Sequence, residues 1–362
     1  MAQIDGDRHS SGIAPYRPSG PVVMKAVAFQ VPLPVDDPRS LVDVDLEDPV
    51  PAAHDLLVEV HAVSVNPVDT KIRQRSAPTE GAWRVLGWDA AGIVRGVGDQ
   101  VTLFKPGDRV WYAGALARQG SNAEMQVVDE RVVGAMPASL GFSAAAALPL
   151  TTITAWEMLF ERLGIEKGSA PSGESILIIG AAGGVGSIMT QLVRRLTSLE
   201  VIGTASRAET RKWLHDLGAH HVLDHTKPLA DELKRAGLRA PKYVVSTTHT
   251  DKHYAQIAEL IAPQGRFGLI DDPAPVAIDV TALKRKSVSL HWEFMFTRSM
   301  FETSDQIEQH RLLNDVARLV DAGVLRTTLG DHFGVINATN LRRAHALIES
   351  GRARGKIVLE GF

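Results

Sequence analysis

The stretch IGAAGGVGS at residues 179–187 contains the glycines whose spacing best suits a chemical role. An apolar, strand-like run ends there, and a segment with the spacing of a helix follows. The residues concerned are Gly180, Gly183, Gly184, Val185 and Gly186. Glycines let backbone N–H groups at a helix start, which carry partial positive charge, come close to an anion. The setting therefore predicts a pyrophosphate site, with simple close packing of the turn as the alternative.

The turn after the next strand bears on which dinucleotide is bound. Proteins that bind NAD commonly place Asp or Glu there, on the ribose hydroxyls. Here the strand VIGTA is followed by Ser206 and Arg207, and Lys212 lies in the next helical segment. A hydroxyl and a guanidinium suit a 2′-phosphate, which a carboxylate would repel. The sequence therefore favours NADPH as cofactor; the alternative is that Arg207 and Lys212 only face solvent.

Alternating strand-like and helix-like segments surround the glycine stretch and must position it. They run as far as SVSLHWEF at 287–294, and repeated βαβ units predict a doubly wound, parallel Rossmann sheet. The preceding part is rich in Val and broken by Gly, Pro and Asp, which predicts a second, mostly antiparallel β-domain. We expect an α/β protein divided into a flexible tail at 1–23, a β-domain at 24–150, the cofactor domain at 151–294 and a C-terminal return to the β-domain at 295–362.

The composition of the 362 residues excludes several classes of protein. Hydrophobic residues make up 44% and charged residues 22%, which is typical of globular chains. The net charge of −3 does not favour nucleic acid as a partner. There is no cysteine, hence no disulfide or thiolate metal site, which fits a cytoplasmic protein. No uncharged apolar run approaches the roughly 18 residues of a membrane span, so we expect no membrane partner.

Five segments carry a resemblance to a known superfamily. They are SVNPVDTKIR, LGWDAAGIVRGVG, FKPGDRVWYAG, LPLTTITAW and SLHWEFMFTRSM. Together with the glycine stretch they make the chain, from Met24 onward, resemble the medium-chain dehydrogenase/reductase superfamily. Within it the chain looks like the zinc-free quinone oxidoreductase branch, and most like the subgroup called zinc-type alcohol dehydrogenase-like. The resemblance implies that the β-domain is a GroES-like catalytic domain and that the cofactor domain binds NADP.

The residues of a catalytic zinc site are missing from this resemblance. Zinc-dependent members place Cys before a Thr-Asp pair and a His-Glu pair in the next loop. The matching places here read NPVD at 66–69 and GWD at 87–89, and the cysteines of a structural zinc lobe are absent. No tetrahedral N/S site can be assembled from these residues, so we expect no metal. Without a Lewis acid, hydride transfer favours electron-poor acceptors such as quinones or enones.

The resemblance also implies roles for residues around the cofactor. Asn66 would lie beside the nicotinamide and Asp69 would help to shape the site, unless the Asn-Pro pair is only a turn signal. Thr154, with Thr151 as a weaker candidate, would bond the cofactor near its nicotinamide end, and His225 would contact the adenosine end. Further candidate contacts lie at strand ends and near the C-terminus: Thr247, Thr248, Ile270, Asp271, Arg354 and Lys356.

Aromatic residues supply the expected substrate pocket, because flat apolar walls suit a quinone or an enone. The candidates are Trp88, Tyr112, His291, Trp292 and Phe294, with ordinary core packing as the alternative for each. A reduced quinone takes its protons from solvent, whereas the enolate formed from an enone needs a donor. Tyr112, His291 or a water molecule could be that donor.

These residues predict a zinc-independent, NADPH-dependent oxidoreductase that transfers hydride to an activated acceptor, with a quinone favoured. An alkenal or enone reductase is the alternative within catalysis. A non-catalytic NADPH-binding sensor or structural protein is the alternative of another class, since its cofactor loop would read the same. We also expect a homodimer, because SVSLHWEF would be an exposed edge strand in a monomer.

Overall fold

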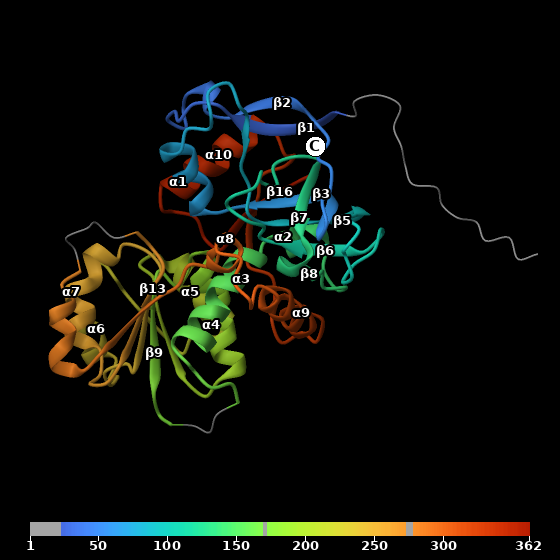
Figure 1. Cartoon of the computed structure of the whole chain (residues 1–362). Coiled ribbons are helices and arrows are strands. Elements are labelled where there is room, and N and C mark those ends of the chain that lie inside the picture. Colours follow the sequence, from blue (N-terminus) through green and yellow to red (C-terminus); the bar gives the residue numbers. More distant parts are fainter. Residues whose placement is uncertain (1–22, 169–171, 273–277) are drawn as a thin grey trace, which may run out of the picture.

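The computed structural model describes residues 23–168, 172–272 and 278–362. Within these ranges a β-rich part and an α/β part lie side by side (Figure 1). The fold class is the predicted one, because a parallel sheet flanked by helices is joined to mostly antiparallel β structure. The tail expected at 1–23 lies outside the described residues, apart from Val23. No helix in the described ranges is both long and apolar enough to cross a bilayer.

The α/β part is built on a sheet whose six described strands all run parallel, in the order β11-β10-β9-β12-β13-β14. These are β9 (Ser175–Ile179), β10 (Glu200–Thr204), β11 (His221–Leu223), β12 (Tyr243–Ser246), β13 (Arg266–Leu269) and β14 (Ser289–Trp292). This is the order 3-2-1-4-5-6 of dinucleotide-binding folds, and it reverses direction between β9 and β12. The reversal marks the place at the carboxyl edge of the sheet where such folds bind their ligand.

Helices cover both faces of this sheet because alternate residues of a strand point to opposite sides. In β9, Ile176 and Ile178 share one hydrophobic cluster with α4 and α5, whereas Leu177 and Ile179 share another with α6 and α7. The four helices are α4 (Gly184–Leu196), α5 (Ala208–Leu217), α6 (Leu229–Arg235) and α7 (Thr250–Leu260). Every residue of β9 is buried, so the strand that leads into the glycine loop is held rigidly from both sides.

The β-rich part contains two sheets among the described residues. The smaller has the order β2-β1-β4, with β1 (Val23–Phe29), β2 (Val42–Glu47) and β4 (Arg84–Val85). The larger has the order β15-β16-β3-β5-β6-β8, and β7 also pairs with β3. Its strands are β3 (Asp55–Val65), β5 (Ala90–Val97), β6 (Arg109–Tyr112), β7 (Met125–Asp129), β8 (Val133–Ala135), β15 (Leu329–His332) and β16 (Lys356–Glu360).

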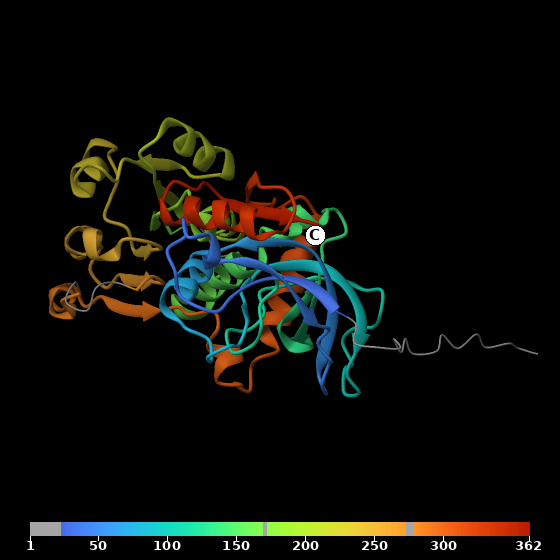
Figure 2. The ribbon, with the colours of Figure 1, turned by 90° about the horizontal axis from the view of Figure 1, so that it is seen from above.

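The remaining helices and the C-terminal segment complete the fold. The helices outside the cofactor sheet are η1 (Pro38–Ser40), α1 (Pro67–Arg75), η2 (Glu130–Val132), α2 (Phe142–Ala146), α3 (Pro149–Trp156), the π-helical η3 (Glu157–Arg162), η4 (Val280–Lys286), α8 (Thr297–Met300), α9 (Glu308–Asp321) and α10 (Ala338–Glu349). After α10, β16 returns to the β-rich part and pairs antiparallel with β3. Figure 2 shows this returning segment in red beside the blue strands. One hydrophobic cluster runs through both parts.

Candidate cofactor and catalytic site

The loop between β9 and α4 has the geometry of an anion site. Gly180 adopts φ 75°, which favours glycine. A Cβ atom on Gly186 would lie 2.4 Å from Cα of Ala181, so only glycine allows the helix to start this close to the strand. Gly183 caps α4 without a side-chain hydrogen bond, and the first turn holds no acidic residue. The backbone N–H groups of this first turn have no acceptor within the helix, so they are suited to bind a diphosphate.

Two predicted threonines lie against this loop from across the reversal point of the sheet. A Cβ atom on Gly180 would be 2.5 Å from Oγ1 of Thr247 and 2.8 Å from Cγ2 of Thr248. Both threonines follow β12, and the Thr247 hydroxyl donates to a backbone carbonyl at the end of β9 over 2.9 Å. Ile270 follows β13 at the same edge and is half-buried. The structure thus gathers these predicted residues along one edge.

The turn after β10 is open to solvent. Ser206 and Arg207 are exposed, and the Arg207 guanidinium donates to the carbonyl of Arg352 over 3.0 Å. Arg207 also pairs with Glu209 of α5 at 3.3 Å, and the Lys212 ammonium pairs with Asp216 one turn along the same helix, at 2.6 Å. The Lys212 side chain is 76% exposed. Both cations therefore have a carboxylate partner in α5, and Arg207 alone of the two also contacts the C-terminal turn.

The C-terminal turn GRARGK touches the glycine loop directly. The N–H of Gly355 donates to the carbonyl of Ala182 over 2.9 Å. The Arg354 guanidinium lies 5.0 Å from the centre of the Trp213 ring, and the Trp213 indole donates to Ser187 in the first turn of α4. The buried Nε atom of Arg354 has no hydrogen-bond partner within the described part of the chain. A basic side chain with an unused donor thus stands beside the loop.

Lys356 is the centre of a buried polar network. Its ammonium donates to the carbonyl of Val65 over 3.1 Å, to Oδ2 of Asp89 over 2.9 Å and to Oδ1 of Asn66. The Asn66 amide in turn donates to Asp89 over 2.8 Å, and the other Asp89 oxygen accepts from the N–H of Leu150 over 2.8 Å. Lys356, Asn66 and Asp89 are each at most 2% exposed. The ammonium is directed at these acceptors, which differs from the predicted diphosphate contact.

This network lies directly beneath the first residue of α4. A Cβ atom on Gly184 would be 2.8 Å from Cδ of Lys356 and 3.0 Å from Cγ2 of Thr151. Thr151, the weaker of the two threonine candidates, is therefore the one that contacts the loop. Thr154 lies inside α3, and its buried hydroxyl donates to the carbonyl of Leu150 over 2.9 Å. The β-rich part and the cofactor loop meet at Gly184.

Burial dominates the electrostatics of the two carboxyl groups here. Burial raises the pKa of Asp89, while the Lys356 ammonium and the hydrogen bonds from Leu150 and Asn66 act against that rise. Burial also raises the pKa of Asp69 to about 7. Asp69 accepts from the N–H of Asn66 over 2.8 Å, and its Oδ1 is buried without a partner among the described residues.

Two of the predicted aromatic pocket residues belong to the core. Trp88 is 0% exposed and Tyr112 is 1% exposed. The Tyr112 hydroxyl donates to Oε1 of Gln126 over 2.8 Å, and burial raises its pKa above the usual range. A group that is enclosed, protonated and already bonded has no access to substrate in this structure. The packing alternative therefore describes both residues here.

The other aromatic candidates are open to solvent at the end of β14. Trp292 is 52% exposed and Phe294 is 48% exposed. Phe294 contacts Phe296 with ring centres 5.6 Å apart, and Phe296 contacts Trp88 at 6.4 Å, so a chain of rings runs from the surface to the core. His291 is bonded to the hydroxyl of a neighbouring serine at 2.8 Å. Trp292 and Phe294 are the two candidates that a flat substrate could reach.

Asp89 is the member of this buried network that the sequence analysis did not single out. Its carboxylate also accepts from the hydroxyl of Ser64 over 3.2 Å, so four donors converge on it. The available signal was a charged residue directly before the apolar run AAGIV. Charged residues are rarely fully buried without a partner, so an acid at such a position predicts a buried cation elsewhere in the chain.

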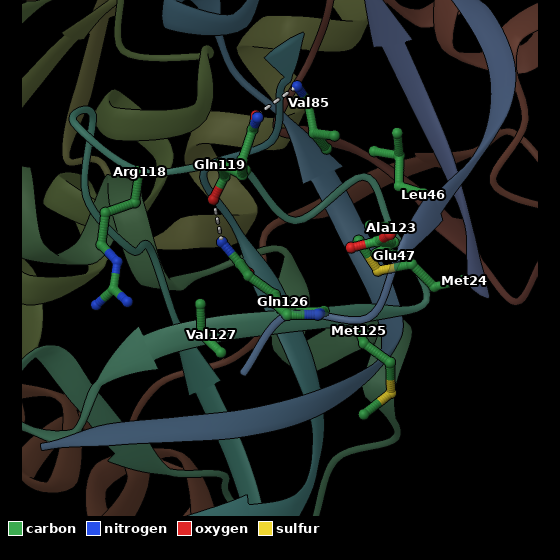
Figure 3. A pocket seen from close by; sticks show the side chains of 12 residues that line it. Met24, Leu46, Glu47, Val85, Arg118, Gln119, Ala123, Met125, Gln126 and Val127 are labelled. Atoms are coloured by element: carbon green, nitrogen blue, oxygen red, sulfur yellow. Dashed lines mark hydrogen bonds between the residues drawn. The ribbon is translucent and has the colours of Figure 1, made fainter. Parts of the chain in front are cut away.

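A separate cavity of about 340 Å³ lies away from this site (Figure 3). Its lining comes from β1, β2, β4, β7 and the loops around them, including Met24, Leu46, Val85 and Met125. The Arg118 side chain at its rim is paired with Asp55 at 2.7 Å. Since the lining includes no residue of the cofactor sheet, we assign the cavity to neither cofactor nor substrate.

Family models match two parts of the chain. The model of the alcohol dehydrogenase GroES-like domain matches residues 52–153, and that of the zinc-binding dehydrogenases matches residues 217–359. A zinc-type alcohol dehydrogenase-like protein of Staphylococcus epidermidis is 40% identical over 341 residues, which cover 93% of this chain and 99% of the relative. Quinone oxidoreductase of Rattus norvegicus is 29% identical over 318 residues, which cover 87% and 92%.

Two solved structures extend these matches. A Rhizobium etli protein described as a zinc-dependent alcohol dehydrogenase is 60% identical, with a TM-score of 0.90 over 94% of this chain and 98% of that one. A mycobacterial protein solved in complex with NADPH is 25% identical, with a TM-score of 0.78 over 93% and 99%. The identity and coverage together show that this chain belongs to the medium-chain dehydrogenase/reductase superfamily of oxidoreductases, in the group of the zinc-type alcohol dehydrogenase-like proteins.

Proposed function

We propose that this chain is an NADPH-dependent oxidoreductase that transfers hydride to a quinone without a catalytic zinc ion. The observation that carries the proposal is the buried ion pair between Lys356 and Asp89, joined by Asn66. Asn66 stands where zinc-dependent relatives have a cysteine ligand, and Trp88 stands where they have a histidine. The oxygen atoms of Asn66 and Asp89, which a metal ion would need as ligands, are therefore bonded to the Lys356 ammonium.

The donor set does not fit a zinc ion. Within the described ranges, no group of three or more His, Cys, Asp or Glu side chains is arranged to hold a metal. The Trp88 indole cannot act as a ligand, and the whole chain lacks cysteine. An alcohol substrate gains most from a Lewis acid, whereas a quinone is already electron-poor, so this donor set favours the quinone.

The nicotinamide cofactor fits the residues that surround the glycine loop. The first turn of α4 supplies N–H groups for a diphosphate, and the Arg354 guanidinium stands beside that turn with an unused donor. At the end of β10, Ser206 and Arg207 take the place of the acidic residue that would hold the ribose of NAD. These cationic groups support NADPH. When bound, the cofactor supplies the hydride, and this chain orients it.

The choice of acceptor follows from the proton donors. The Tyr112 hydroxyl is buried and bonded, and His291 is bonded to a serine. Reduction of an enone needs a proton donor for the enolate, which the enclosed Tyr112 hydroxyl does not offer, whereas a quinone takes its protons from water. The half-exposed rings of Trp292 and Phe294 offer a flat apolar wall at the end of β14. The named activity of the rat relative agrees with this choice.

The test is the oxidation of NADPH, followed optically, with an ortho-quinone, a para-quinone, an enal and a simple aldehyde. NADH is run in parallel, and a chelator is added to one set. We expect turnover of a quinone with NADPH that the chelator does not reduce. Faster turnover of the enal would favour the enone reductase instead. Tight NADPH binding without any turnover would leave a non-catalytic NADPH-binding protein.

The predicted homodimer has support from the edge of the cofactor sheet. β14 is the last strand of the order among the described residues, so one of its edges has no described partner strand. Pairing of two copies along this edge would cover the unpaired backbone groups of the strand. We expect a mass of two chains in solution at micromolar concentration; a single-chain mass would refute the dimer.

A further inference from the structure

Three histidines gather at the carboxyl edge of the cofactor sheet, and we call them the histidine cluster: His225, His249 and His253. His225 follows β11, His249 caps α7, and His253 lies in the first turn of α7. The rings of His225 and His253 are 6.2 Å apart and inclined by 73°. His249 adopts φ 50°, a conformation in which few residues other than glycine are found.

Two of these rings have an unused polar atom. Nδ1 of His225 and Nδ1 of His253 are buried and have no hydrogen-bond partner among the residues that the structure describes. Both side chains are half-buried, so each ring also has access to solvent or to a ligand. A buried polar atom without a partner costs free energy, and such atoms are rare in folded proteins unless a ligand satisfies them.

The position of the cluster relates it to the adenosine half of the cofactor. The ends of β10 and β11 are joined, since the N–H of Ala205 donates to the carbonyl of Leu223 over 2.9 Å. His225 therefore follows close behind the turn that carries Arg207. On the other side, His249 directly follows Thr248, which lies against the glycine loop. The strands that precede His225 and His249, β11 and β12, flank β10 and β9, whose turns would hold the ribose and the diphosphate, so the cluster borders both turns.

Burial, more than the surrounding charges, lowers the pKa of the two rings and so favours their neutral form. Burial lowers the pKa of His225 and of His253, and the charge of a protonated His249 lowers each further. For His253, a protonated His225 and Lys252 act in the same direction. Asp224 raises the pKa of His225 and Asp251 raises that of His253, but less strongly than burial lowers them. Glu232, in the neighbouring α6, is paired with Arg235.

We propose that the histidine cluster forms part of the site for the 2′-phosphate and takes up protons when this phosphate binds, so that affinity for NADPH rises as pH falls. The inference rests on the proposed NADPH dependence. A phosphate dianion beside an imidazole favours the protonated ring, so binding and protonation are linked. NADH lacks this phosphate, and its affinity would not change in the same way.

The direction in which NADPH affinity changes with pH distinguishes protonation of the histidine cluster from protonation of the 2′-phosphate. The 2′-phosphate itself gains a proton near pH 6, which weakens its attraction to Arg207 and Arg354 as pH falls. The histidine cluster has the opposite effect. Each linked proton changes the dissociation constant by up to about tenfold per pH unit. We expect the ratio of the NADH to the NADPH dissociation constant to rise several-fold between about pH 7.5 and about pH 6.5.

The test measures binding of NADPH and NADH to the full chain by calorimetry, in two buffers of different ionisation enthalpy at each pH. This measurement counts the protons taken up. The variant combines His225→Asn and His253→Asn, since an amide retains a polar atom near Nδ1 but cannot be protonated. The matched control is His221→Asn, at the other end of β11, where the imidazole pairs with Glu200 at 2.9 Å.

We expect proton uptake with NADPH in the wild type and the control, and none in the double variant or with NADH. Equal uptake in the double variant, or equal uptake with NADH, would overturn the inference. NADPH preferred at every pH without proton uptake would also overturn it, but would leave the proposed function standing. A chain that binds NADH better than NADPH at every pH would refute both the proposed cofactor and this inference.

Discussion

Removal of the Lys356 ammonium is the sharpest perturbation of the candidate site. Lys356→Met retains most of the side-chain stem that packs against Gly184, but it deletes the cation that Asp89 and Asn66 share. The Asp89 carboxylate would then be a fully buried charge without a counter-ion. Breaking a buried ion pair from one side typically costs about 3–5 kcal/mol, because the remaining charge is left uncompensated.

The loss of stability in Lys356→Met should depend on pH. Burial already raises the pKa of Asp89, and in the variant the opposing Lys356 charge is gone. A carboxyl group whose pKa is higher in the folded than in the unfolded state loses stability as pH rises through the folded value. The difference between wild type and variant should therefore be largest in alkaline solution and shrink in acid. Adding Asp89→Asn should recover much of the loss.

The assay is urea unfolding followed by tryptophan fluorescence, since Trp88 and Trp111 are buried in the β-rich part. The matched control is Arg95→Met, which breaks an ion pair with Glu59 whose side chains are 50% and 37% exposed. Exposed pairs contribute at most about 1 kcal/mol. Equal losses in Lys356→Met and Arg95→Met, or no rescue by Asp89→Asn, would refute the buried network.

Three further predictions test separate parts of the site. Gly186→Ala should abolish cofactor binding measured by fluorescence, because its Cβ would lie 2.4 Å from the loop backbone, whereas Gly141→Ala, with open space around its Cβ, should not. Tyr112→Phe should leave kcat within about threefold and cost about 1 kcal/mol in urea, since its hydroxyl only bonds in the core; a hundredfold fall in kcat would restore Tyr112 as proton donor. Burial raises the pKa of Glu293 to about 9. Stability of the wild type should therefore fall as pH rises from about 4.5 to about 9 and level off above that, while Glu293→Gln should show a flatter profile in thermal unfolding.

The sequence predicted the elements better than the direction of individual side chains. Strand and helix periods around residues 175–294 were strong enough to predict the parallel sheet and the glycine loop at its edge. Arg354 and Lys356 were equal candidates for the diphosphate, because both lie in one short turn. The structure separates them, since Arg354 lies on Trp213 whereas the Lys356 ammonium points into the β-rich part. No local pattern contains that difference.

Contacts between residues that lie far apart in the chain also could not be predicted from the sequence. His253 meets His225 only because α6 and α7 pack side by side on one face of the sheet, and nothing near either residue indicates the contact. Trp88 shows the same limit in the core. The resemblance identified it as the replacement for a metal ligand, but its burial against Phe296 depends on a segment about 200 residues later.

The buried network would also make the proposed zinc-independent site rigid. Its donors and acceptors come from β3, α3, β16 and the residues just before β5, which are far apart in the chain. A metal ion joins distant elements through directed bonds to its ligands, and here the Lys356–Asp89 pair makes comparable directed contacts. Because the Lys356 stem also touches Gly184, the same residue links the β-rich part to the loop proposed to hold the diphosphate. We infer that the pair retains the positioning role of a central cation but offers no Lewis acid to the substrate, which restricts the chemistry to acceptors that are already activated.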